Sequence, residues 1–329
     1  MTDFSLLDAP VLSRSAVLRD EPLRVDVERQ RKGWASAQLV VVDAQGRTPI
    51  VWDAEPHAPL EHVDAGRWDV GGAARLDTRP TTGDGPPDDA VLLGEADGTA
   101  YWAVRGEPDP FGDDDPAAWA DLRSTGAVLD ALGAGLFTTA AAALNWHASA
   151  RFCSRDGSPT RPAHAGWHRH CEANGHEEYP RTDPAVICLV HDGGSGAGAR
   201  VLLARQPVWP EGRFSVLAGF VEAGESLEAC VLREIHEEVG VHVRDVRYLG
   251  SQSWPFPRSL MVGFHAVADP DVPLVPADGE IAEAMWATRA DLRHALAAGD
   301  WSGRDDVPFL LPGKVSIART MLESWAALP

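Results

Sequence analysis

Short apolar runs separated by turn residues dominate the first part of the chain. The run LVVV at residues 39–42 precedes the turn DAQG, and the run VLL at residues 91–93 precedes a turn at Asp97 and Gly98. Apolar runs of this length between Asp and Gly residues are typical of β-hairpins. We therefore expect residues 1–125 to form a β-rich domain, in which we recognise neither a repeat nor a catalytic motif.

The pattern changes beyond residue 125. A long apolar stretch predicts a helix over residues 126–146, and a segment with Cys and His but little apolar periodicity follows at residues 152–178. Further apolar runs predict strands at 185–190, 200–205, 214–220, 243–254, 260–268 and 284–288, and helices at 226–239, 289–298 and 315–327.

Strands and helices that mix without a strict βαβ rhythm indicate an α+β fold. The expected domains are the β-rich N-terminal domain at residues 1–125, a linking helix with a small ribbon-like module at 126–178, and a larger domain at 179–329.

The composition narrows the class of partner. The 329 residues include 29 Lys and Arg against 49 Asp and Glu, a formal net charge of −20. A broad nucleic-acid surface needs clustered basic residues, so this balance disfavours a bulk nucleic-acid binder.

Four cysteines are too few for a disulfide scaffold, and the first residues lack the basic and apolar regions of a signal peptide. The most apolar stretch, residues 128–144, is shorter than the ~20 residues of a membrane span. We expect a cytoplasmic protein without a membrane segment.

Residues 226–239 predict a helix with one acidic face. At 100° per residue, Glu234, Glu237 and Glu238 fall within an arc of about 100° beside an apolar arc. Ser226 can cap the N-terminus of this helix and Gly240 can end it. A solvated charge stripe is the usual meaning of such a face. However, Glu234 and Glu238 form an i, i+4 like-charge pair, which costs helix stability unless a cation neutralises it. Because carboxylates suit Mg²⁺ or Mn²⁺, we expect a metal-binding face.

The spacing around this helix resembles that of the Nudix hydrolase family. Residues 219–241 read GFVEAGESLEACVLREIHEEVGV and match the family's box at each specified position. The resemblance implies a loop-helix-loop on an α/β/α sandwich and an enzyme that splits a nucleotide pyrophosphate with Mg²⁺ or Mn²⁺. It places the metal on Glu234, Glu238 and the main-chain carbonyl of Ala218. The resemblance also implies that Arg233 orients a glutamate through a salt bridge.

Cleavage of a pyrophosphate needs divalent metal to neutralise its negative oxygens and to deprotonate or orient a water. A carboxylate then accepts the proton. Glu237 and Glu238 are the best-placed bases on the helix, and the sequence does not decide between them. Glu280, on the approach to the last expected strand, resembles the extra metal-binding glutamate that many family members supply from outside the box. Glu283 is the alternative.

Residues 251–259 read SQSWPFPRS and hold two prolines and two aromatic rings directly after a strand. From the residues alone, this segment is equally well a stacking surface for a base or nicotinamide ring and a strand end with an aromatic core contact. It resembles the SQPWPFPxS motif of the NADH pyrophosphatase branch of the family, with Ser253 in place of a proline. The resemblance implies substrate contacts from Gln252, Ser253, Trp254, Pro255, Phe256, Pro257, Arg258 and Ser259.

That branch cuts NAD(H) to nicotinamide mononucleotide and AMP, and its enzymes can remove an NAD cap from RNA. The resemblance implies that Tyr179 and Phe220 sandwich the adenine and that Ala318 contacts the nucleotide through its backbone. Because the counterpart of Tyr179 reaches across a dimer interface in this branch, a homodimer is implied as well.

The same branch usually carries a four-cysteine zinc ribbon before the Nudix domain. Here the two CxxC pairs read CSRD at residues 153–156 and CEAN at residues 171–174, so half of the thiolates are missing. Asp156 could join Cys153 and Cys171 as a ligand, and one of three histidines could complete the site; these are His168, His170 and His176. Structural zinc sites favour four Cys or His donors. We therefore expect no zinc and a segment held by packing of Phe152 and Trp167.

Three functions remain open at this point. The first is a metal-dependent NAD(H) diphosphatase, and the second is an NAD-cap hydrolase that makes the same cut on RNA 5′ ends. The acidic composition favours the small substrate. The third is a catalytically inactive domain that binds a nucleotide as a regulator. A lost box glutamate would mark this third case, and none is lost.

Overall fold

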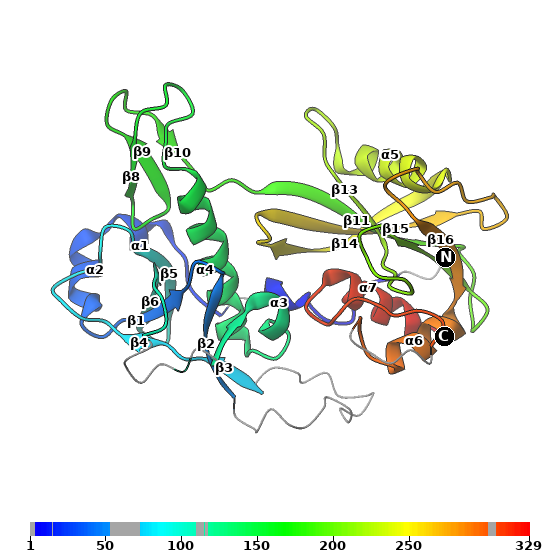
Figure 1. Ribbon diagram of the computed structural model, residues 1–329, viewed down its shortest axis with the longest axis horizontal. Helices are drawn as coiled ribbons and strands as arrows, with labels where there is room; N and C mark the ends of the chain where they lie inside the picture. The colour runs from blue at the N-terminus through cyan, green and yellow to red at the C-terminus, as the bar shows by residue number, and fades with distance from the viewer. Residues whose placement is uncertain (1–3, 15, 53–72, 110–114, 116–117, 302–306) are drawn as a thin grey trace. The chain divides into compact units, whose positions relative to one another are not determined.

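The computed structural model describes residues 4–14, 16–52, 73–109, 115, 118–301 and 307–329. The chain folds into two compact units (Figure 1). The first unit comprises Met1–Ser13, Asp183–Ser253 and Ser259–Pro329, and the second comprises Arg14–Thr182 and Trp254–Arg258. These units differ from the expected domains in three respects. The linking helix and the ribbon belong with the N-terminal domain, residues 4–13 belong with the C-terminal one, and Trp254–Arg258 belong to the second unit.

The first unit is built on a six-stranded mixed sheet. Its central strand β11 (Asp183–His191) pairs in parallel with β15 (Ser259–Ala268) and antiparallel with β12 (Arg200–Arg205) and β13 (Leu217–Phe220). The edges are β14 (Val243–Trp254), beside β15, and β16 (Glu283–Thr288), antiparallel to β12. The expected strands are thereby confirmed, although the one predicted at 214–220 begins only at Leu217. Ser215 before it forms only an isolated bridge with Ala204.

Helices cover both faces of this sheet (Figure 1). On one face α5 (Leu227–Val239) packs in a cluster with Val186, Cys188 and Val190 of β11. On the other, α6 (Arg289–Ala297) and α7 (Ile317–Ala326) pack in a cluster with Ile187 and Leu189 of the same strand. Successive residues of a strand point to opposite faces, so residues 184–190 of β11 are all apolar because both faces of the strand are covered. The α/β/α sandwich is confirmed.

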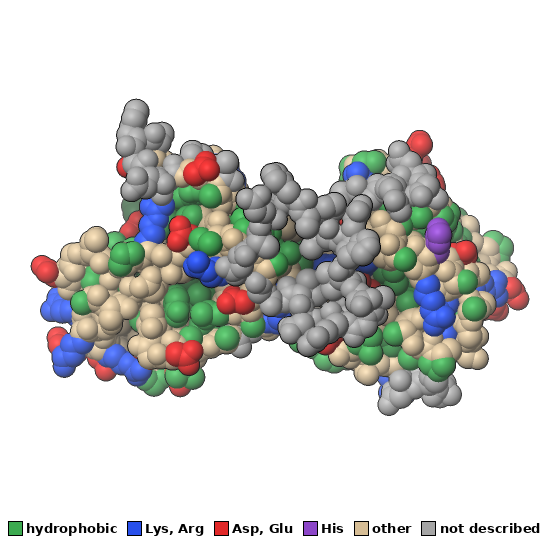
Figure 2. Space-filling model, turned by 90° about the horizontal axis from the view of Figure 1, so that it is seen from below, with side chains coloured by type: hydrophobic (Ala, Val, Ile, Leu, Met, Phe, Trp, Pro, Cys, Tyr) green, Lys and Arg blue, Asp and Glu red, His purple; other side chains and the backbone are tan. Residues whose placement is uncertain are grey.

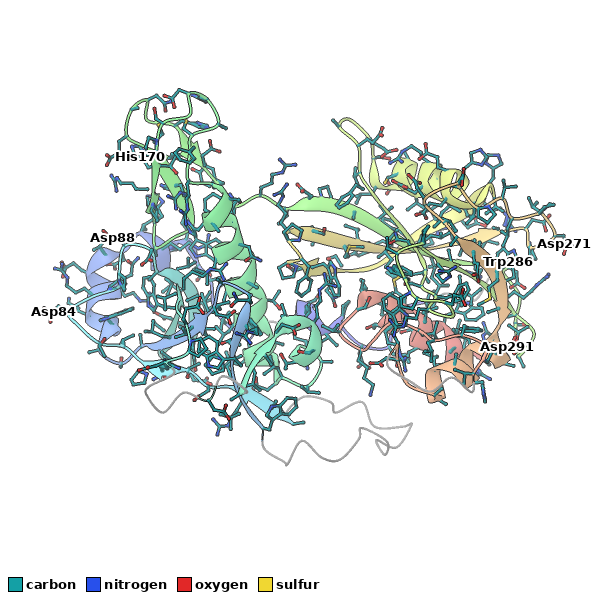
Figure 3. All side chains as sticks on the ribbon, in the orientation of Figure 1. Asp84, Asp88, His170, Asp271, Trp286 and Asp291 are labelled. Atoms are coloured by element: carbon teal, nitrogen blue, oxygen red, sulfur yellow. The ribbon has the colours of Figure 1, made fainter. Side chains whose placement is uncertain are left out.

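Local signals set the ends of these helices. The Ser226 side chain accepts a hydrogen bond of 3.1 Å from Ala229 N–H at the start of α5, and Gly240 ends the helix with a left-handed φ of 75°. Both capping predictions are confirmed. At α6, Thr288 and Asp291 form a reciprocal capping box. Asp291 stands at the start of this helix in Figure 3.

Over its described residues, the second unit contains strands in the expected region and the expected long helix, together with three shorter helices that the hydrophobic pattern did not predict. One sheet has the order β4 (Arg79–Pro80), β1 (Gln38–Val42), β6 (Thr99–Arg105), β5 (Val91–Ala96), with β1 and β6 parallel. Another has the order β3 (Ala74–Leu76), β2 (Arg47–Trp52), β7 (Trp119–Asp121). The helices are α1 (Glu21–Val25), α2 (Val27–Trp34), α3 (Leu122–Thr125) and α4 (Ala131–Ser149). The helix expected at 126–146 starts at Ala131 because Asp130 caps it, accepting from Gly133 N–H at 2.6 Å.

The ribbon module is a small three-stranded sheet within the second unit, made of β8 (Thr160–Ala163), β9 (His168–Cys171) and β10 (Glu177–Glu178). His170, which is labelled in Figure 3, lies on β9 of this module. Trp167 anchors the module as expected: its Nε1–H donates to Leu92 O at 2.7 Å, and the Arg24 guanidinium lies 3.8 Å from its ring centroid. The expectation for Phe152 was wrong, because this side chain is 64% exposed. In the described part of the chain, no helix combines the length and the apolarity needed to cross a membrane.

Candidate active site

The box helix α5 and the adjoining strand β13 form the centre of the site. The carboxylate of Glu234 lies so close to the backbone of Gly219 that a Cβ added at Gly219 would come within 1.9 Å of Glu234 Cδ. No side chain fits there. The glycine of the box is required by this close approach, since its φ lies outside the left-handed region.

Arg233 ties three acidic side chains of the box together. It makes a bidentate pair with Glu225, with Nε–Oε1 and Nη2–Oε2 distances of 2.8 Å each. Its Nη1 lies 2.9 Å from Glu234 Oε1 and 2.9 Å from Glu237 Oε2, and Nη2–H donates to Phe220 O at 3.0 Å. The hydrogen bonds from Arg233 lower the pKa of Glu225 to about 2, and those same partners raise the pKa of Arg233. The guanidinium thus stays charged and holds the acidic side chains in place.

Glu238 is a buried carboxyl in a cluster of like charges. It is 7% exposed, and its Oε2 has no hydrogen-bond partner among the described residues. Burial raises the pKa of Glu238 to about 8, and the charges of Glu234 and Glu280 act in the same direction, while a backbone hydrogen bond of Ala218 opposes them. A buried carboxylate without a compensating charge is costly, and a bound cation removes that cost. These residues therefore fit a divalent metal ion.

The structure brings the proposed metal-binding residues together and pairs the alternative, Glu283, with an arginine. Ala218, Glu234 and Glu280 all act on Glu238. Glu283 instead pairs with Arg205, at 2.8 Å between Glu283 Oε1 and Nη2.

The residues of the SQSWPFPRS segment, 251–259, have different surroundings. The rings of Trp254 and Phe256 lie 4.8 Å apart, edge to face. Gln252, by contrast, is 1% exposed: its Oε1 accepts from Leu12 N–H at 3.3 Å, and its Nε2–H donates to Val315 O at 3.0 Å. Its side chain is engaged inside the first unit, whereas the two rings offer aromatic surface.

Of the three residues expected around the adenine, two are exposed aromatic side chains and the third is buried. Tyr179 and Phe220 are 60% and 59% exposed, and the Tyr179 hydroxyl donates to Glu177 Oε2 at 2.5 Å. Ala318 is 1% exposed, and its N–H donates to Ser316 Oγ at 3.2 Å as part of the cap of α7. The two rings are available to a ligand in a single chain, and the Ala318 N–H is already engaged.

One end of the ribbon gathers four polar side chains, which we name the ribbon cluster: Cys153, Asp156, Cys171 and Asn174. The ligand atoms of the first three lie within 4.8 Å of one another. Asn174 Nδ2–H donates to Asp156 Oδ2 at 2.7 Å and to Cys153 Sγ at 3.5 Å, while its Oδ1 accepts from His176 N–H. The fourth position thus presents a donor where zinc needs a lone pair. The set does not fit the closed four-ligand site of a structural zinc.

The sequence analysis missed two residues of the second unit that contact the aromatic turn. The Arg123 guanidinium lies over the rings of Trp254 and Phe256, and Asn145 Nδ2–H donates to Pro255 O at 3.4 Å. No local pattern marks either residue, because both contacts span more than a hundred residues of sequence.

Three family models match the chain, one after another, between residues 35 and 307. Residues 181–307 match the NUDIX domain, residues 148–179 match the NADH pyrophosphatase zinc ribbon domain, and residues 35–146 match the NADH pyrophosphatase-like rudimentary NUDIX domain. The last match assigns a family to residues 35–146, where the sequence analysis recognised no motif.

The chain is also similar to individual proteins, over different shares of its length. The chain is 52% identical over 327 residues to the NAD-capped RNA hydrolase NudC of Mycobacterium tuberculosis, covering 99% of this chain and 97% of that protein. It is 38% identical over 213 residues to the mitochondrial NAD(P)H pyrophosphatase NUDT13 of Homo sapiens, covering 63% and 59%. A solved MutT/nudix family protein from Enterococcus faecalis has 27% identity and a TM-score of 0.31, covering 35% and 47%.

Proposed function

Because this chain belongs to the Nudix hydrolase family, in its NADH pyrophosphatase branch, we propose that it hydrolyses the pyrophosphate of NADH and NAD⁺ to NMN(H) and AMP. The observation that carries this proposal is the buried Glu238 carboxyl, which has an unpartnered oxygen and lies among Glu234 and Glu280. Support for the substrate comes from the SQSWPFPRS segment and from a relative named as an NAD(P)H pyrophosphatase.

Nudix hydrolases use divalent metal, and we propose Mg²⁺ or Mn²⁺ here. Glu234, Glu238, Glu280 and the carbonyl of Ala218 would hold it, and these hard oxygen donors suit either ion. When bound, the ion neutralises phosphate charge and makes a water more acidic.

Side chains of the protein position the glutamates and accept the proton. Arg233 holds Glu234 and Glu237 in fixed positions through the ion pairs described above. Glu237 or Glu238 accepts the proton of the attacking water. The Glu237 side chain is 55% exposed, so a water can reach it, whereas Glu238 is buried at the metal-binding face.

We propose a homodimer for the nucleotide end of the substrate. Tyr179 and Phe220 each expose an aromatic ring in the single chain. The adenine would lie between Tyr179 of one protomer and Phe220 of its partner. Tyr179→Ala should then raise KM more than it lowers kcat, and light scattering should show a dimer.

NAD-capped RNA is the second candidate substrate, because a relative that is 52% identical over 99% of this chain is named an NAD-capped RNA hydrolase. The same pyrophosphate is cut. The formal charge of −20 opposes a long polyanion. On the face shown in Figure 2, basic side chains stand in small groups among acidic and neutral ones. We therefore place the free dinucleotide first.

Turnover of NADH and of a short NAD-capped RNA, measured with the same preparation, tests this order. We expect a higher kcat/KM for NADH. An equal or higher kcat/KM for the RNA would reverse the order of the two substrates. No turnover of either substrate, combined with tight binding of NADH, would favour the third function, an inactive domain that binds a nucleotide as a regulator.

We also propose that the ribbon holds its shape without zinc. The hydrogen bonds of Asn174 to Asp156 and Cys153 replace two metal–thiolate bonds, and Trp167 fixes the module to the rest of the second unit.

A further inference from the structure

The turn that carries the aromatic rings of the SQSWPFPRS segment packs in a different unit from its flanking strands. β14 as far as Ser253 and all of β15 belong to the first unit, whereas Trp254–Arg258 belong to the second. Most of the second unit matches the rudimentary NUDIX domain, residues 35–146. The turn that carries the rings therefore belongs to a unit that lacks the Nudix box.

Arg123 contacts both rings of the turn. Its Cζ lies 4.0 Å from the ring centroid of Phe256 and 5.1 Å from that of Trp254. A guanidinium over an aromatic face is attracted by the quadrupole of the ring, and its planar shape allows it to stack. Arg123 can thus restrict the orientation of both rings at once.

The backbone around Arg123 is itself anchored. Asp121 Oδ1 accepts from Arg123 N–H at 2.8 Å and from Ser124 N–H at 3.1 Å, which caps the short helix α3. Leu122 and Thr125 on this helix are 1% and 2% exposed. The backbone that carries the Arg123 side chain is therefore held in place by the cap of α3 and by its buried neighbours.

Asn145 holds the backbone of the same turn. Its Nδ2–H donates to Pro255 O at 3.4 Å, and its Oδ1 accepts from Arg105 Nη2–H at 2.8 Å. Arg105 Nη1–H donates in turn to Asp43 O at 2.6 Å. This chain of hydrogen bonds connects the turn to the rudimentary domain through the long helix α4.

We propose that Arg123 and Asn145 are positioning residues for substrate binding, which hold Trp254 and Phe256 in the orientation that receives a flat ring of the dinucleotide. The inference rests on the proposed function. It concerns the affinity for substrate and not the chemical step.

Steady-state kinetics with NADH test this inference. Arg123→Met removes the cation and keeps an unbranched apolar side chain. We expect KM to rise roughly 3- to 30-fold, the range of a partly buried cation–π contact. We expect kcat to stay within about 2-fold, because the chemical step uses other residues. Arg123→Lys keeps the charge without the planar stack and should recover part of the loss.

Arg24→Met is the matched control. Arg24 lies 3.8 Å from the ring centroid of Trp167 in the same unit, so this variant loses an equivalent contact away from the turn. We expect its kinetic constants to equal those of the unsubstituted chain. A double-mutant cycle of Arg123→Met with Phe256→Leu should be non-additive in KM, since Arg123 acts through that ring.

The outcomes are distinct. KM values within 2-fold of the unsubstituted chain for both folded Arg123 variants would overturn the inference. So would an effect on kcat alone, or an equal effect of Arg24→Met. If Arg123→Met fails to fold, the Lys variant and the Phe256 variant decide by the same criteria. Failure of the unsubstituted chain to hydrolyse NADH would overturn the proposed function, and the inference with it.

Discussion

The Glu234 carboxylate occupies the space that a side chain at Gly219 would need, with a Cβ at Gly219 only 1.9 Å from Glu234 Cδ. This relationship connects strand β13 to helix α5 at the centre of the site. A glycine on the strand lets a carboxylate on the helix lie against the backbone, beside Glu238 and the partners of Arg233. A side chain at position 219 would therefore have to displace the Glu234 carboxylate.

Gly219→Ala should displace Glu234 and reduce kcat by about 100-fold or more, because a shift of about 1 Å in a positioned group can cost that much. Circular dichroism should show that the variant remains folded. Gly198→Ala is the control, since a Cβ at Gly198 meets nothing within 4 Å and the position needs no left-handed φ. Activity of Gly219→Ala equal to that of Gly198→Ala would show that Glu234 does not need this space.

Glu238→Gln should abolish hydrolysis and, in the absence of metal, raise the melting temperature. The substitution removes a buried ionisable group from the like charges of Glu234 and Glu280. The stabilisation that Mg²⁺ or Mn²⁺ gives to the unsubstituted chain should disappear. Thermal melts with and without metal measure both effects.

Glu228→Gln on the same helix is the control for this experiment. Glu228 is exposed and lies in the first turn of α5. It should keep both the activity and the metal-dependent stabilisation. Retained activity in Glu238→Gln and in the corresponding Glu237→Gln would remove both residues from the mechanism.

The box helix could be predicted closely because its signals are local. Ser226, Gly240 and the spacing of the glutamates all lie within one short segment, and each is found in its expected place. The pairing of Arg233 with Glu225 was foreseen only as a salt bridge to an unnamed glutamate, because the partner is chosen by the loop that precedes the helix.

The long-range features could not be read from the sequence. In the first unit β11 pairs in parallel with β15, and in the second β1 pairs in parallel with β6. This shared feature accords with two Nudix-like domains, but the second carries no box to identify it. Gln252 belongs to the substrate motif by sequence, yet its side chain is buried by partners from both ends of the first unit, Leu12 and Val315. Such contacts depend on tertiary structure that no local pattern records.

Acid should destabilise the first unit through His191. Burial lowers the pKa of His191 to about 4, and His265, at 3.2 Å between Nδ1 and His191 Nε2, acts in the same direction. Asp192 opposes this shift, and Arg289 and Arg244 add to it. The unfolded chain binds this proton near pH 6.5, so the stabilisation is complete above that pH and is lost as the pH falls toward about 4. The loss is on the order of 2 kcal/mol.

Urea denaturation between pH 7 and pH 4 measures this dependence. His191→Gln removes the titrating group and should flatten the curve over that range. The exposed His294, in the same unit, provides the control variant His294→Gln, which should leave the curve unchanged. An identical slope in the His191 variant and the unsubstituted chain would assign the acid sensitivity to other groups.

Zinc should be absent from the purified protein, and cysteines at two positions should restore it. Asp156→Cys with Asn174→Cys would complete two CxxC pairs around Cys153 and Cys171, whose sulfur atoms already lie within reach of one metal. Elemental analysis should then give about one zinc per chain for the double variant, the content of a closed four-thiolate site. Stoichiometric zinc in the unsubstituted protein that a chelator removes with loss of folded structure would contradict the hydrogen-bonded ribbon cluster.

The most direct test of the proposed activity is to incubate the protein with NADH and Mg²⁺ or Mn²⁺ in ¹⁸O-labelled water and to identify the products by mass spectrometry. Reduced nicotinamide mononucleotide and AMP should form in equal amounts, with the label in one of the two new phosphate groups, and a chelator should stop the reaction. Release of nicotinamide with the pyrophosphate intact, or unchanged NADH in the presence of either metal, would contradict the account.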